Sequence, residues 1–227
     1  MNKKTGYCLP IIKHSKADVL SKLKEASKDD FYQKFEIWLD YINGVDRLFI
    51  DEILQKYPDK IVFVFRRQNL KKPKLNLDSQ LNLLSRMQKN CLVDMDVYDQ
   101  KELIAKSNNL KLKKIISYHN YKETPADEKL RENIIDIEAH TPEIIKLAAF
   151  CRTKTDALRL LKLMLELKNK GKKHIVLGMG ANGTITRLFG VFWGNELTFI
   201  PESKSEGSAP GQLARAEMDT IFERIKT

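Results

Sequence analysis

The stretch EIIKLAAFCRTKTDALRLLKLMLELKNKGKKHIVLGMG, residues 143–180, decides the fold of this chain. Its two short apolar runs, Ile144–Ala149 and His174–Met179, have the length and composition of buried strands. Between them, Thr155–Lys170 has the apolar spacing of an amphipathic helix. A strand, a helix and a second strand in this order are typical of parallel strands joined by a crossover helix.

The helical segment also predicts how it packs. Leu158, Leu161 and Leu165, with the flanking Met164, are spaced to form one apolar face. Gly171 follows as a helix stop, because glycine readily adopts the left-handed conformation that ends many helices. We therefore expect these four apolar side chains to lie in the core rather than to form a cofactor site.

The same alternation extends over the whole chain. We expect eight strands, at Gly6–Ile12, Phe35–Ile42, Lys60–Arg66, Cys91–Val97, Lys114–His119, Ile144–Ala149, His174–Met179 and Glu196–Ile200. We expect eight helices, at Ala17–Ser27, Val45–Tyr57, Leu77–Lys89, Asp99–Ser107, Ala126–Ile137, Thr155–Lys170, Thr184–Phe192 and Gly211–Lys226. Eight parallel strands that are each followed by a helix close a barrel, so the predicted fold is an α/β (β/α)8 TIM barrel. Residues 1–227 carry no Pro-rich linker and no internal repeat, which predicts a single domain.

Composition argues against several classes of protein. No run approaches the roughly 18 uninterrupted apolar residues of a membrane span, and the first residues are polar, so we expect no export signal and no membrane partner. Cys8, Cys91 and Cys151 lack the spacing of a disulfide framework or a zinc site, which indicates a cytoplasmic protein without a metal. The formal net charge of +10 is spread along the chain among acidic neighbours. We therefore expect a solvated surface and no nucleic-acid partner.

Two polar side chains stand out, because barrels of this type carry catalytic groups at the C-terminal ends of their strands. His119 ends the expected strand Lys114–His119, where it would face the barrel mouth or bond the loop backbone. Lys146 lies within the apolar sixth strand, and it either snorkels outward between helices or enters the barrel interior. In the interior, desolvation would lower the pKa of its amine and make it a nucleophile toward carbonyls.

Two loops add groups suited to anions and hydroxyls. Met179 begins a glycine-containing loop after the seventh strand, and Arg187 follows on the next helix, where it could clamp a carboxylate. After the eighth strand, Ser208 and Gln212 would direct a hydroxyl and an amide toward the same mouth. The polar segment Glu202–Gly207 is a candidate lid. The glycine spacing does not match a nucleotide-binding fingerprint.

Four motifs together resemble the signature of type I 3-dehydroquinate dehydratase. In chain order they are Ser-Tyr-His119-Asn, Ile-Lys146-Leu-Ala, the stretch from Met179 to Arg187, and Ser208-Ala-Pro-Gly-Gln212. The first half of the chain adds matches to that family at Cys8-Leu-Pro-Ile, Glu36, Asp40, Phe65-Arg66 and Asp94. The resemblance therefore covers nearly the whole chain.

This resemblance implies a dehydration of 3-dehydroquinate to 3-dehydroshikimate that needs no cofactor and no metal. Lys146 would form an imine with the substrate ketone, and His119 would take a proton from the adjacent carbon and return it to the leaving hydroxyl. Arg187 would bind the substrate carboxylate, and Met179 would pack against the ring. The hydroxyls and the carboxylate would also be held by Glu36, Arg66, Ser208 and Gln212. The family also implies a homodimer.

Three departures from the family pattern lie in the first half of the barrel. Trp38 stands where the family has an arginine. The Glu-Gly-Gly turn that normally follows Arg66 is replaced by Arg67-Gln-Asn-Leu-Lys-Lys-Pro73. Asp96 replaces a glutamate that orients the histidine. Because aspartate is one methylene shorter, we expect Asp96 to reach His119 through a water.

Three other functions are compatible with the sequence. The scaffold could host a different Schiff-base lyase or an aldolase-like enzyme that acts on another small carboxylate, and turnover of 3-dehydroquinate would distinguish them. A non-catalytic relative would bind a small carboxylate without forming an imine. A protein that binds nucleic acid through its basic surface would show a steep salt dependence.

Overall fold

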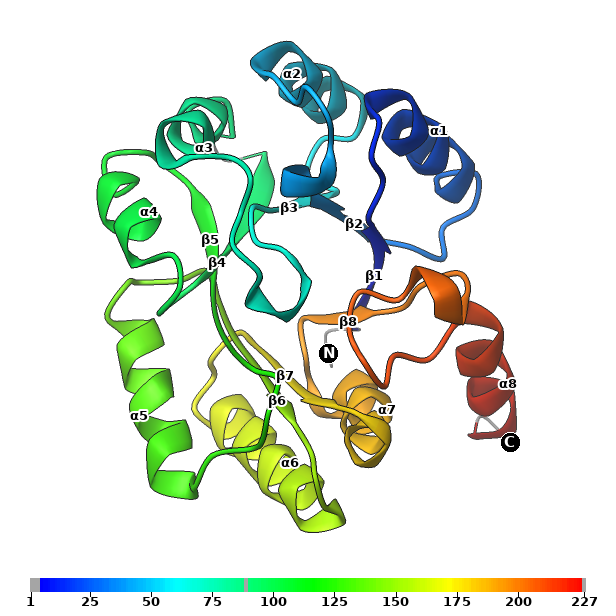
Figure 1. Ribbon diagram of the computed structural model, residues 1–227. Helices are drawn as coiled ribbons and strands as arrows, with labels where there is room; N and C mark the ends of the chain where they lie inside the picture. The colour runs from blue at the N-terminus through cyan, green and yellow to red at the C-terminus, as the bar shows by residue number, and fades with distance from the viewer. Residues whose placement is uncertain (1–4, 88–89, 226–227) are drawn as a thin grey trace.

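The computed structural model describes residues 5–87 and 90–225, and it has the predicted barrel of parallel strands ringed by helices (Figure 1). The strands are β1 (Gly6–Ile11), β2 (Lys34–Trp38), β3 (Ile61–Val64), β4 (Cys91–Asp96), β5 (Lys113–Asn120), β6 (Ile144–Phe150), β7 (His174–Met179) and β8 (Leu197–Phe199). The helices are α1 (Lys16–Ala26), α2 (Arg47–Lys56), α3 (Leu77–Leu84), α4 (Lys101–Lys106), α5 (Asp127–Glu138), α6 (Lys154–Asn169), α7 (Thr184–Trp193) and α8 (Arg215–Ile225). The expected (β/α)8 architecture is therefore confirmed.

The strands follow the order β7-β6-β5-β4-β3-β2-β1-β8, and all neighbours in this order pair in parallel. At the seam between β7 and β8, the Glu196 N–H donates to the His174 carbonyl at 2.8 Å. The Asn195 side chain takes over the next rung, because its Oδ1 accepts from the Val176 N–H at 2.9 Å and its Nδ2 donates to the Val176 carbonyl at 3.1 Å. A side-chain amide thus substitutes for strand backbone where the barrel closes.

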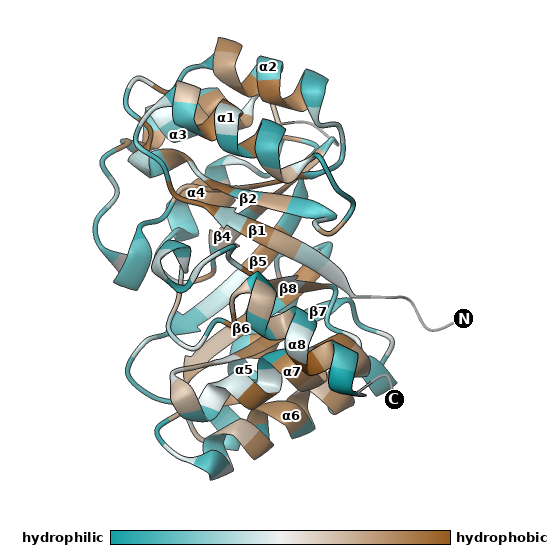
Figure 2. Cartoon of the chain, turned by 90° about the vertical axis from the view of Figure 1, so that its right-hand side faces the viewer, coloured by the Kyte–Doolittle hydropathy of each residue, from teal (hydrophilic) through white to brown (hydrophobic). Residues whose placement is uncertain are grey.

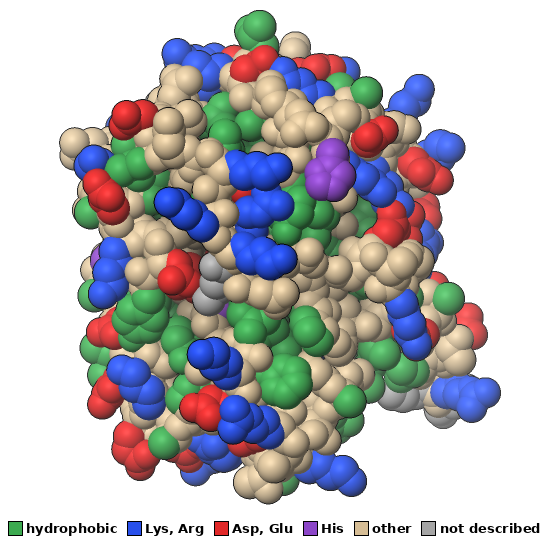
Figure 3. All heavy atoms as spheres, in the orientation of Figure 1, with side chains coloured by type: hydrophobic (Ala, Val, Ile, Leu, Met, Phe, Trp, Pro, Cys, Tyr) green, Lys and Arg blue, Asp and Glu red, His purple; other side chains and the backbone are tan. Residues whose placement is uncertain are grey.

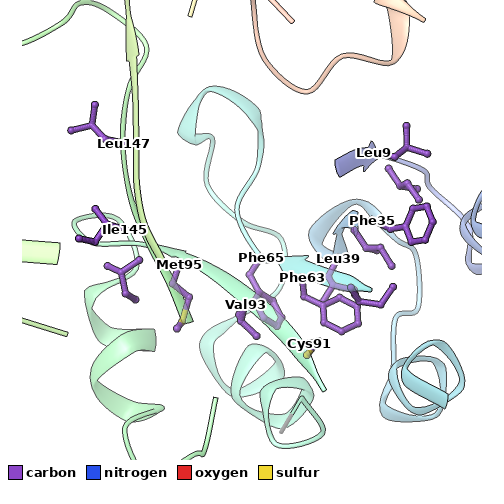
Figure 4. Close-up of a cluster of buried hydrophobic side chains, with 14 of the residues drawn as sticks. Leu9, Phe35, Leu39, Phe63, Phe65, Cys91, Val93, Met95, Ile145 and Leu147 are labelled. Carbon is purple, nitrogen blue, oxygen red and sulfur yellow. The ribbon is translucent and has the colours of Figure 1, made fainter. Parts of the chain in front are cut away.

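Side chains alternate between the inside and the outside of the barrel, as the two-residue period of a strand requires. The apolar interior is formed by Cys8, Val62, Leu92, Ile115, Ile144, Ala148, Ile175, Leu177, Met179, Leu197 and Phe199. A larger cluster fills the space between strands and helices, and Leu9, Phe35, Phe63, Val93 and Leu147 belong to it (Figure 4). In the side view, α1, α2 and α3 cover one side of the strands and α5, α6, α7 and α8 the other (Figure 2).

The predicted apolar face of α6 is half wrong. Leu161 and Met164 are buried as expected, but Leu158 is 65% exposed and Leu165 is 37% exposed. The buried side chains of α6 are Ala157, Leu160, Leu161, Leu163, Met164 and Leu167. The segment has enough leucines to populate two faces, so spacing alone does not identify the face that packs on the strands.

Several element boundaries differ from the predictions, and two of the differences have a clear structural cause. The second strand ends at Trp38 instead of Ile42, and a short 3-10 turn follows, where the buried Asp40 carboxylate accepts the main-chain N–H groups of Lys74 and Leu75 at 2.8 Å each. The last helix begins at Arg215 instead of Gly211, because Gly211 has a positive φ of 80°. The third helix ends at Leu84, earlier than predicted, and Ser85 caps it. The predicted helix ends at Lys89 and Lys226 lie outside the described residues.

Within residues 5–87 and 90–225, no helix has both the length and the hydropathy needed to cross a membrane.

Candidate active site

A cavity opens at the C-terminal ends of the strands, on the face that Figure 1 shows toward the viewer. It encloses about 380 Å³ of space, part of it open to solvent. Eight of the nine predicted site residues line it: Glu36, Arg66, His119, Lys146, Met179, Arg187, Ser208 and Gln212. The ninth, Asp96, lies directly behind one of them, where it contacts His119. The structure therefore brings the predicted set together around one cavity.

Lys146 points into the barrel interior, which decides between the two placements that the sequence allowed. Its side chain is only 5% exposed, and its Nζ lies 2.6 Å from Oδ2 of Asp94 and 3.6 Å from Oε1 of Glu36. The Phe199 ring lies 4.3 Å from the same nitrogen, so the amine has carboxylates on one side and an aromatic face on another. Lys146 is thus desolvated but not isolated from charge.

Asp94 is the hub that joins Lys146 to a second cation. Arg66 donates to both carboxylate oxygens, with Nη1 at 2.8 Å from Oδ1 and Nη2 at 2.9 Å from Oδ2. The Ser117 hydroxyl donates to Oδ1 at 2.6 Å. Although burial alone would raise the pKa of Asp94, Arg66 and Lys146 hold it well below the usual range. The Asp94 carboxylate therefore stays ionised in a site that is otherwise rich in cations.

The contacts of His119 determine its tautomer. Its Nδ1 lies 2.9 Å from Oδ2 of Asp96, which can only accept, and its Nε2 lies 3.2 Å from Nη2 of Arg66, which can only donate. The proton of the neutral imidazole therefore sits on Nδ1, and Nε2 keeps its lone pair. Asp96 makes this contact directly, so the expected bridging water is not needed and that expectation was wrong.

Burial lowers the pKa of His119 to about 4, and the positive charges of Arg66 and Lys146 act in the same direction. The hydrogen bond to Asp96 opposes them but does not compensate. Desolvation alone would raise the pKa of Asp96, but the bond to His119, the nearby charges of His119 and Arg66 and the main-chain bond from Asp99 together lower it. At neutral pH the imidazole is thus uncharged and able to accept a proton.

Arg187 is a buried cation that pairs with no carboxylate in the described part of the chain. Its side chain is 2% exposed, and its Nη2 donates to the Pro210 carbonyl at 3.3 Å. Among the described residues, none bonds its Nε or Nη1. Burial lowers the pKa of this guanidinium to about 10. A buried, incompletely bonded guanidinium that lines a cavity is suited to an anionic ligand.

The loop after β7 brings Arg187 to the cavity through a close backbone approach. A Cβ atom on Gly183 would lie 2.4 Å from the carbonyl carbon of Gly178, so only glycine allows the first turn of α7 to pack on β7. Thr186 secures this contact, because its Oγ1 accepts from the Gly178 N–H and donates to the Gly183 carbonyl, both at 2.7 Å. The next side chain on α7 is Arg187.

Ser208 and Gln212 form one unit after β8. The Gln212 Oε1 accepts from the main-chain N–H groups of Ser208 at 2.7 Å and Ala209 at 3.2 Å, and its Nε2 donates to the Ser208 hydroxyl at 3.0 Å. The candidate lid, Glu202–Gly207, precedes this unit and is tied to the first βα unit, since Lys22 pairs with both Glu202 and Glu206.

Trp38, the first departure from the family pattern, belongs to the cavity wall. Its indole Nε1 donates to Oε2 of Glu36 at 2.8 Å, and its side chain is buried. The Arg66 guanidinium lies 5.6 Å from the ring centroid. The indole therefore orients Glu36 by a hydrogen bond where an arginine would form an ion pair.

The loop between β3 and α3, residues 65–76, is the second departure, and it crosses the centre of the barrel mouth (Figure 1). Arg67 fixes its start, because its guanidinium pairs with Asp40 at 3.0 Å and stacks on the Tyr41 ring at 4.1 Å. The Gln68 side chain donates to the Ser208 carbonyl at 3.1 Å. The β3–α3 loop therefore reaches across the mouth and bonds to the segment that follows β8.

Several cavity or hub residues were not among the predicted site residues, and four of them bear on the chemistry. Asp94 had the same signal as Lys146, a charge inside an apolar strand, and Ser117 shares the inward face of β5 with His119. Phe199 gave no signal, because an apolar residue in a buried strand is unremarkable by itself. Tyr121 follows the predicted His119 motif by two residues and lines the cavity beside it.

Basic side chains gather near the centre of the mouth face, with acidic ones among and around them (Figure 3). Lys and Arg outnumber Asp and Glu by 40 to 30 in the whole chain. A positive field over the mouth would attract an anionic ligand.

Comparisons with known proteins agree with this arrangement. The family model for type I 3-dehydroquinase matches residues 7–227. A 3-dehydroquinate dehydratase of Methanocaldococcus jannaschii is 33% identical over 224 residues, which cover 95% of this chain and 96% of that protein. One of Methanococcus maripaludis is 31% identical over 225 residues, which cover 96% of this chain and 99% of that protein.

Solved structures of the same name have the same fold. The enzyme of Geobacillus kaustophilus matches with a TM-score of 0.81 at 21% identity, over 99% of this chain and 92% of that one. The type I enzyme of Clostridium difficile matches with a TM-score of 0.80 at 23% identity, over 98% and 92%. These structures establish the fold. The family model and the two sequence relatives show that the chain belongs to the type I 3-dehydroquinase family.

Proposed function

We propose that this protein dehydrates 3-dehydroquinate to 3-dehydroshikimate through an imine on Lys146. The observation that carries the proposal is the placement of a buried lysine, a neutral histidine and an incompletely bonded buried arginine around one cavity. The relatives that are at least 30% identical over nearly the whole chain carry the name 3-dehydroquinate dehydratase.

The reaction starts at Lys146. As the free amine, its Nζ attacks the substrate ketone, and loss of water gives an imine. Asp94 and Glu36, at 2.6 Å and 3.6 Å from Nζ, hold the side chain in the middle of the barrel and stabilise the cationic iminium that replaces the ammonium. The iminium draws electrons from the neighbouring carbon and acidifies its proton.

His119 moves the proton. Its unprotonated Nε2, which faces Arg66 before substrate binds, removes the proton next to the iminium, and an enamine forms. The imidazolium then donates the same proton to the departing hydroxyl, which leaves as water as the enamine electrons form the new double bond. A histidine whose pKa lies near 4 is a strong acid once it is protonated, so the second transfer is driven. Hydrolysis of the product imine regenerates Lys146.

The remaining cavity residues bind the substrate. Arg187 takes the carboxylate, because its Nε and Nη1 have no partner among the described residues. Ser208 and Gln212, on the adjacent loop, take hydroxyl groups, and Met179 packs on the ring. Arg66 holds Nε2 of His119 at 3.2 Å until substrate enters.

Borohydride reduction tests the proposal, because it converts an imine into a stable amine that adds mass to the protein. With 3-dehydroquinate, wild-type protein should gain one adduct that peptide mapping places on Lys146, and the unreduced control should release 3-dehydroshikimate. Lys146→Ala should lose both signals, and Lys34→Ala, a half-buried lysine at the opposite end of the barrel, should keep them. If wild-type protein gives no adduct and no product, the proposed function is refuted.

A carboxylate sensor on the same scaffold predicts a different outcome. It would show saturable binding of 3-dehydroquinate by calorimetry, dependent on Arg187, without an adduct. An aldolase-like enzyme would form an adduct with another ketone but release no 3-dehydroshikimate.

We also propose that the protein is a cytoplasmic homodimer. Its three cysteines are free and buried, as suits a reducing compartment. Helix α7 exposes Ile185, Phe189 and Phe192, which share one face at a spacing of four and three residues. Sedimentation of wild-type protein and of Phe189→Glu tests this contact: a dimer that the substitution dissociates supports it, and a monomeric wild-type protein refutes it.

A further inference from the structure

The ring of Tyr121 lies over the imidazole of His119 at the edge of the cavity. The two rings are nearly parallel, at 16°, and their centroids are 6.3 Å apart. Tyr121 also lines the cavity itself, beside the imidazole. The offset, parallel geometry is that of a stacked aromatic pair.

The β3–α3 loop holds this ring from above. The main chain of Asn69 lies close enough to the Tyr121 hydroxyl to oppose, in part, the burial that raises the pKa of that hydroxyl. Asn69 has a positive φ of 56°, and the loop is fixed beside it by Arg67 on Asp40 and by Gln68 on the Ser208 carbonyl. The segment that replaces the Glu-Gly-Gly turn therefore lies against the ring that stacks beside the histidine.

Charged groups occupy the other sides of the imidazole. Arg66, at the end of β3, faces Nε2, and Asp96 of β4 faces Nδ1. Lys146 of β6 and Asp94 of β4 form the ion pair on the inner side, with Glu36 of β2 beyond it. Asp99, after β4, is close enough to Asp96 for its pKa to be raised by that charge as well as by burial.

These contacts assign Tyr121 as a positioning residue. We propose that its ring, which stacks beside the imidazole next to the β3–α3 loop, shuts water away from the acid–base histidine and keeps it in the orientation that Asp96 and Arg66 define. The role in catalysis rests on the proposed function, whereas the shielding itself does not. Removing the ring admits water, which stabilises the charged imidazolium, and the pKa of His119 then moves from about 4 toward the ordinary 6.5.

The test is the titration of His119 by NMR in protein with labelled histidine. The chain has four histidines, and a His119→Asn spectrum assigns the signal. Tyr121→Ala should raise the pKa of His119 by at least one unit, and Tyr121→Phe, which keeps the ring, should leave it near the wild-type value. Tyr118→Ala is the matched control, because Tyr118 lies next to His119 on β5 but packs its ring on Tyr98.

The pH dependence of kcat/KM gives the second readout. If the pKa of His119 rises by two units, the neutral fraction at pH 5 falls about tenfold, and kcat/KM should fall with it in Tyr121→Ala. Tyr121→Val guards against an alanine variant that does not fold, and it should shift the profile in the same direction. A His119 titration in Tyr121→Ala that matches wild type, or one that Tyr118→Ala shifts equally, would overturn the proposal. If wild-type protein fails to turn over 3-dehydroquinate, the proposed function falls and the NMR titration still decides the role of Tyr121.

Discussion

Replacement of Asp96 by asparagine should switch the tautomer of His119. The Oδ1 atom of Asp96 accepts two main-chain N–H groups, from Tyr98 at 3.0 Å and Asp99 at 3.1 Å. In Asp96→Asn, those donors require the amide oxygen on their side, so the amide nitrogen faces Nδ1 of His119. An amide donates there, and the imidazole proton must move to Nε2. The lone pair that takes the substrate proton is then lost.

The size of the effect follows from the chemistry of that lone pair. A misplaced tautomer costs roughly 10⁴-fold in kcat in the serine-protease triad, where an aspartate has the same relation to a histidine. We expect a loss of about 10³-fold to 10⁴-fold in kcat here. Arg66 disfavours a proton on Nε2 and so partly opposes the switch of tautomer, which accounts for the lower figure. The imine should still form on Lys146, since Asp96 does not contact the lysine.

The assay measures kcat from the ultraviolet absorbance of the conjugated product, together with borohydride trapping of the imine. Asp96→Glu is the matched control, because it keeps an acceptor-only carboxylate and should retain far more activity than Asp96→Asn. A variant Asp96→Asn that folds and dehydrates at more than a tenth of the wild-type rate would refute the tautomer argument. Loss of imine trapping in the same variant would show that Asp96 supports Lys146 instead.

Three further predictions concern other side chains of the site. Arg187→Met should raise KM by about 10-fold to 100-fold, because the charged hydrogen bonds to substrate are lost. It should also raise the free energy of unfolding by about 1–3 kcal/mol in chemical denaturation, because an incompletely bonded buried charge is removed. A destabilised variant would contradict the second expectation. The pKa of His119 is about 4 in the folded protein and 6.5 in the unfolded chain, so the unfolded chain binds the proton first as pH falls. The free energy of unfolding should therefore decrease between pH 6.5 and pH 4, by roughly 3 kcal/mol from this group. Urea unfolding across this range should show a shallower decrease in His119→Asn, and equal slopes would argue against the shifted pKa. Trp38→Phe removes the donor to Glu36 and should cost about 1–3 kcal/mol of stability, whereas an unchanged denaturation midpoint would mean that water replaces the indole.

Much of the fold could be predicted because strand and helix periods are local properties of the sequence. All eight strands were expected within a few residues of their observed bounds, and His174–Met179 matches at both ends. The larger errors occur where a distant segment decides the local structure. The second strand stops early because Asp40 turns inward to cap Lys74 and Leu75, and the helix expected from Gly211 starts later because that residue approaches the Gly180 carbonyl.

The site divides in the same way. Lys146 and His119 could be found from their places in apolar strands, but only the assembled barrel shows that Asp94 stands between Lys146 and Arg66. The direct bond from Asp96 could not be predicted from side-chain length, because it depends on how closely β4 and β5 approach at Asp96 and Ser117. The brace from Gln68 to the Ser208 carbonyl joins residues 140 positions apart, and no local pattern encodes it.

The seam between β7 and β8 predicts where the barrel opens locally. Glu196 and Asn195 close it with one main-chain bond and one side-chain amide pair. The backbone amides along the seam should exchange their hydrogens before those of the central strands, because few bonds must break to expose them. Arg187 follows one side of this seam and Ser208 the other, so opening there would part the groups that bind substrate while the strands that carry Lys146 and His119 stay paired. The seam bonds to His174 and Val176 lie toward the N-terminal end of β7, so strand pairing is weakest at the end of the barrel away from the mouth, between the two strands that precede Arg187 and Ser208.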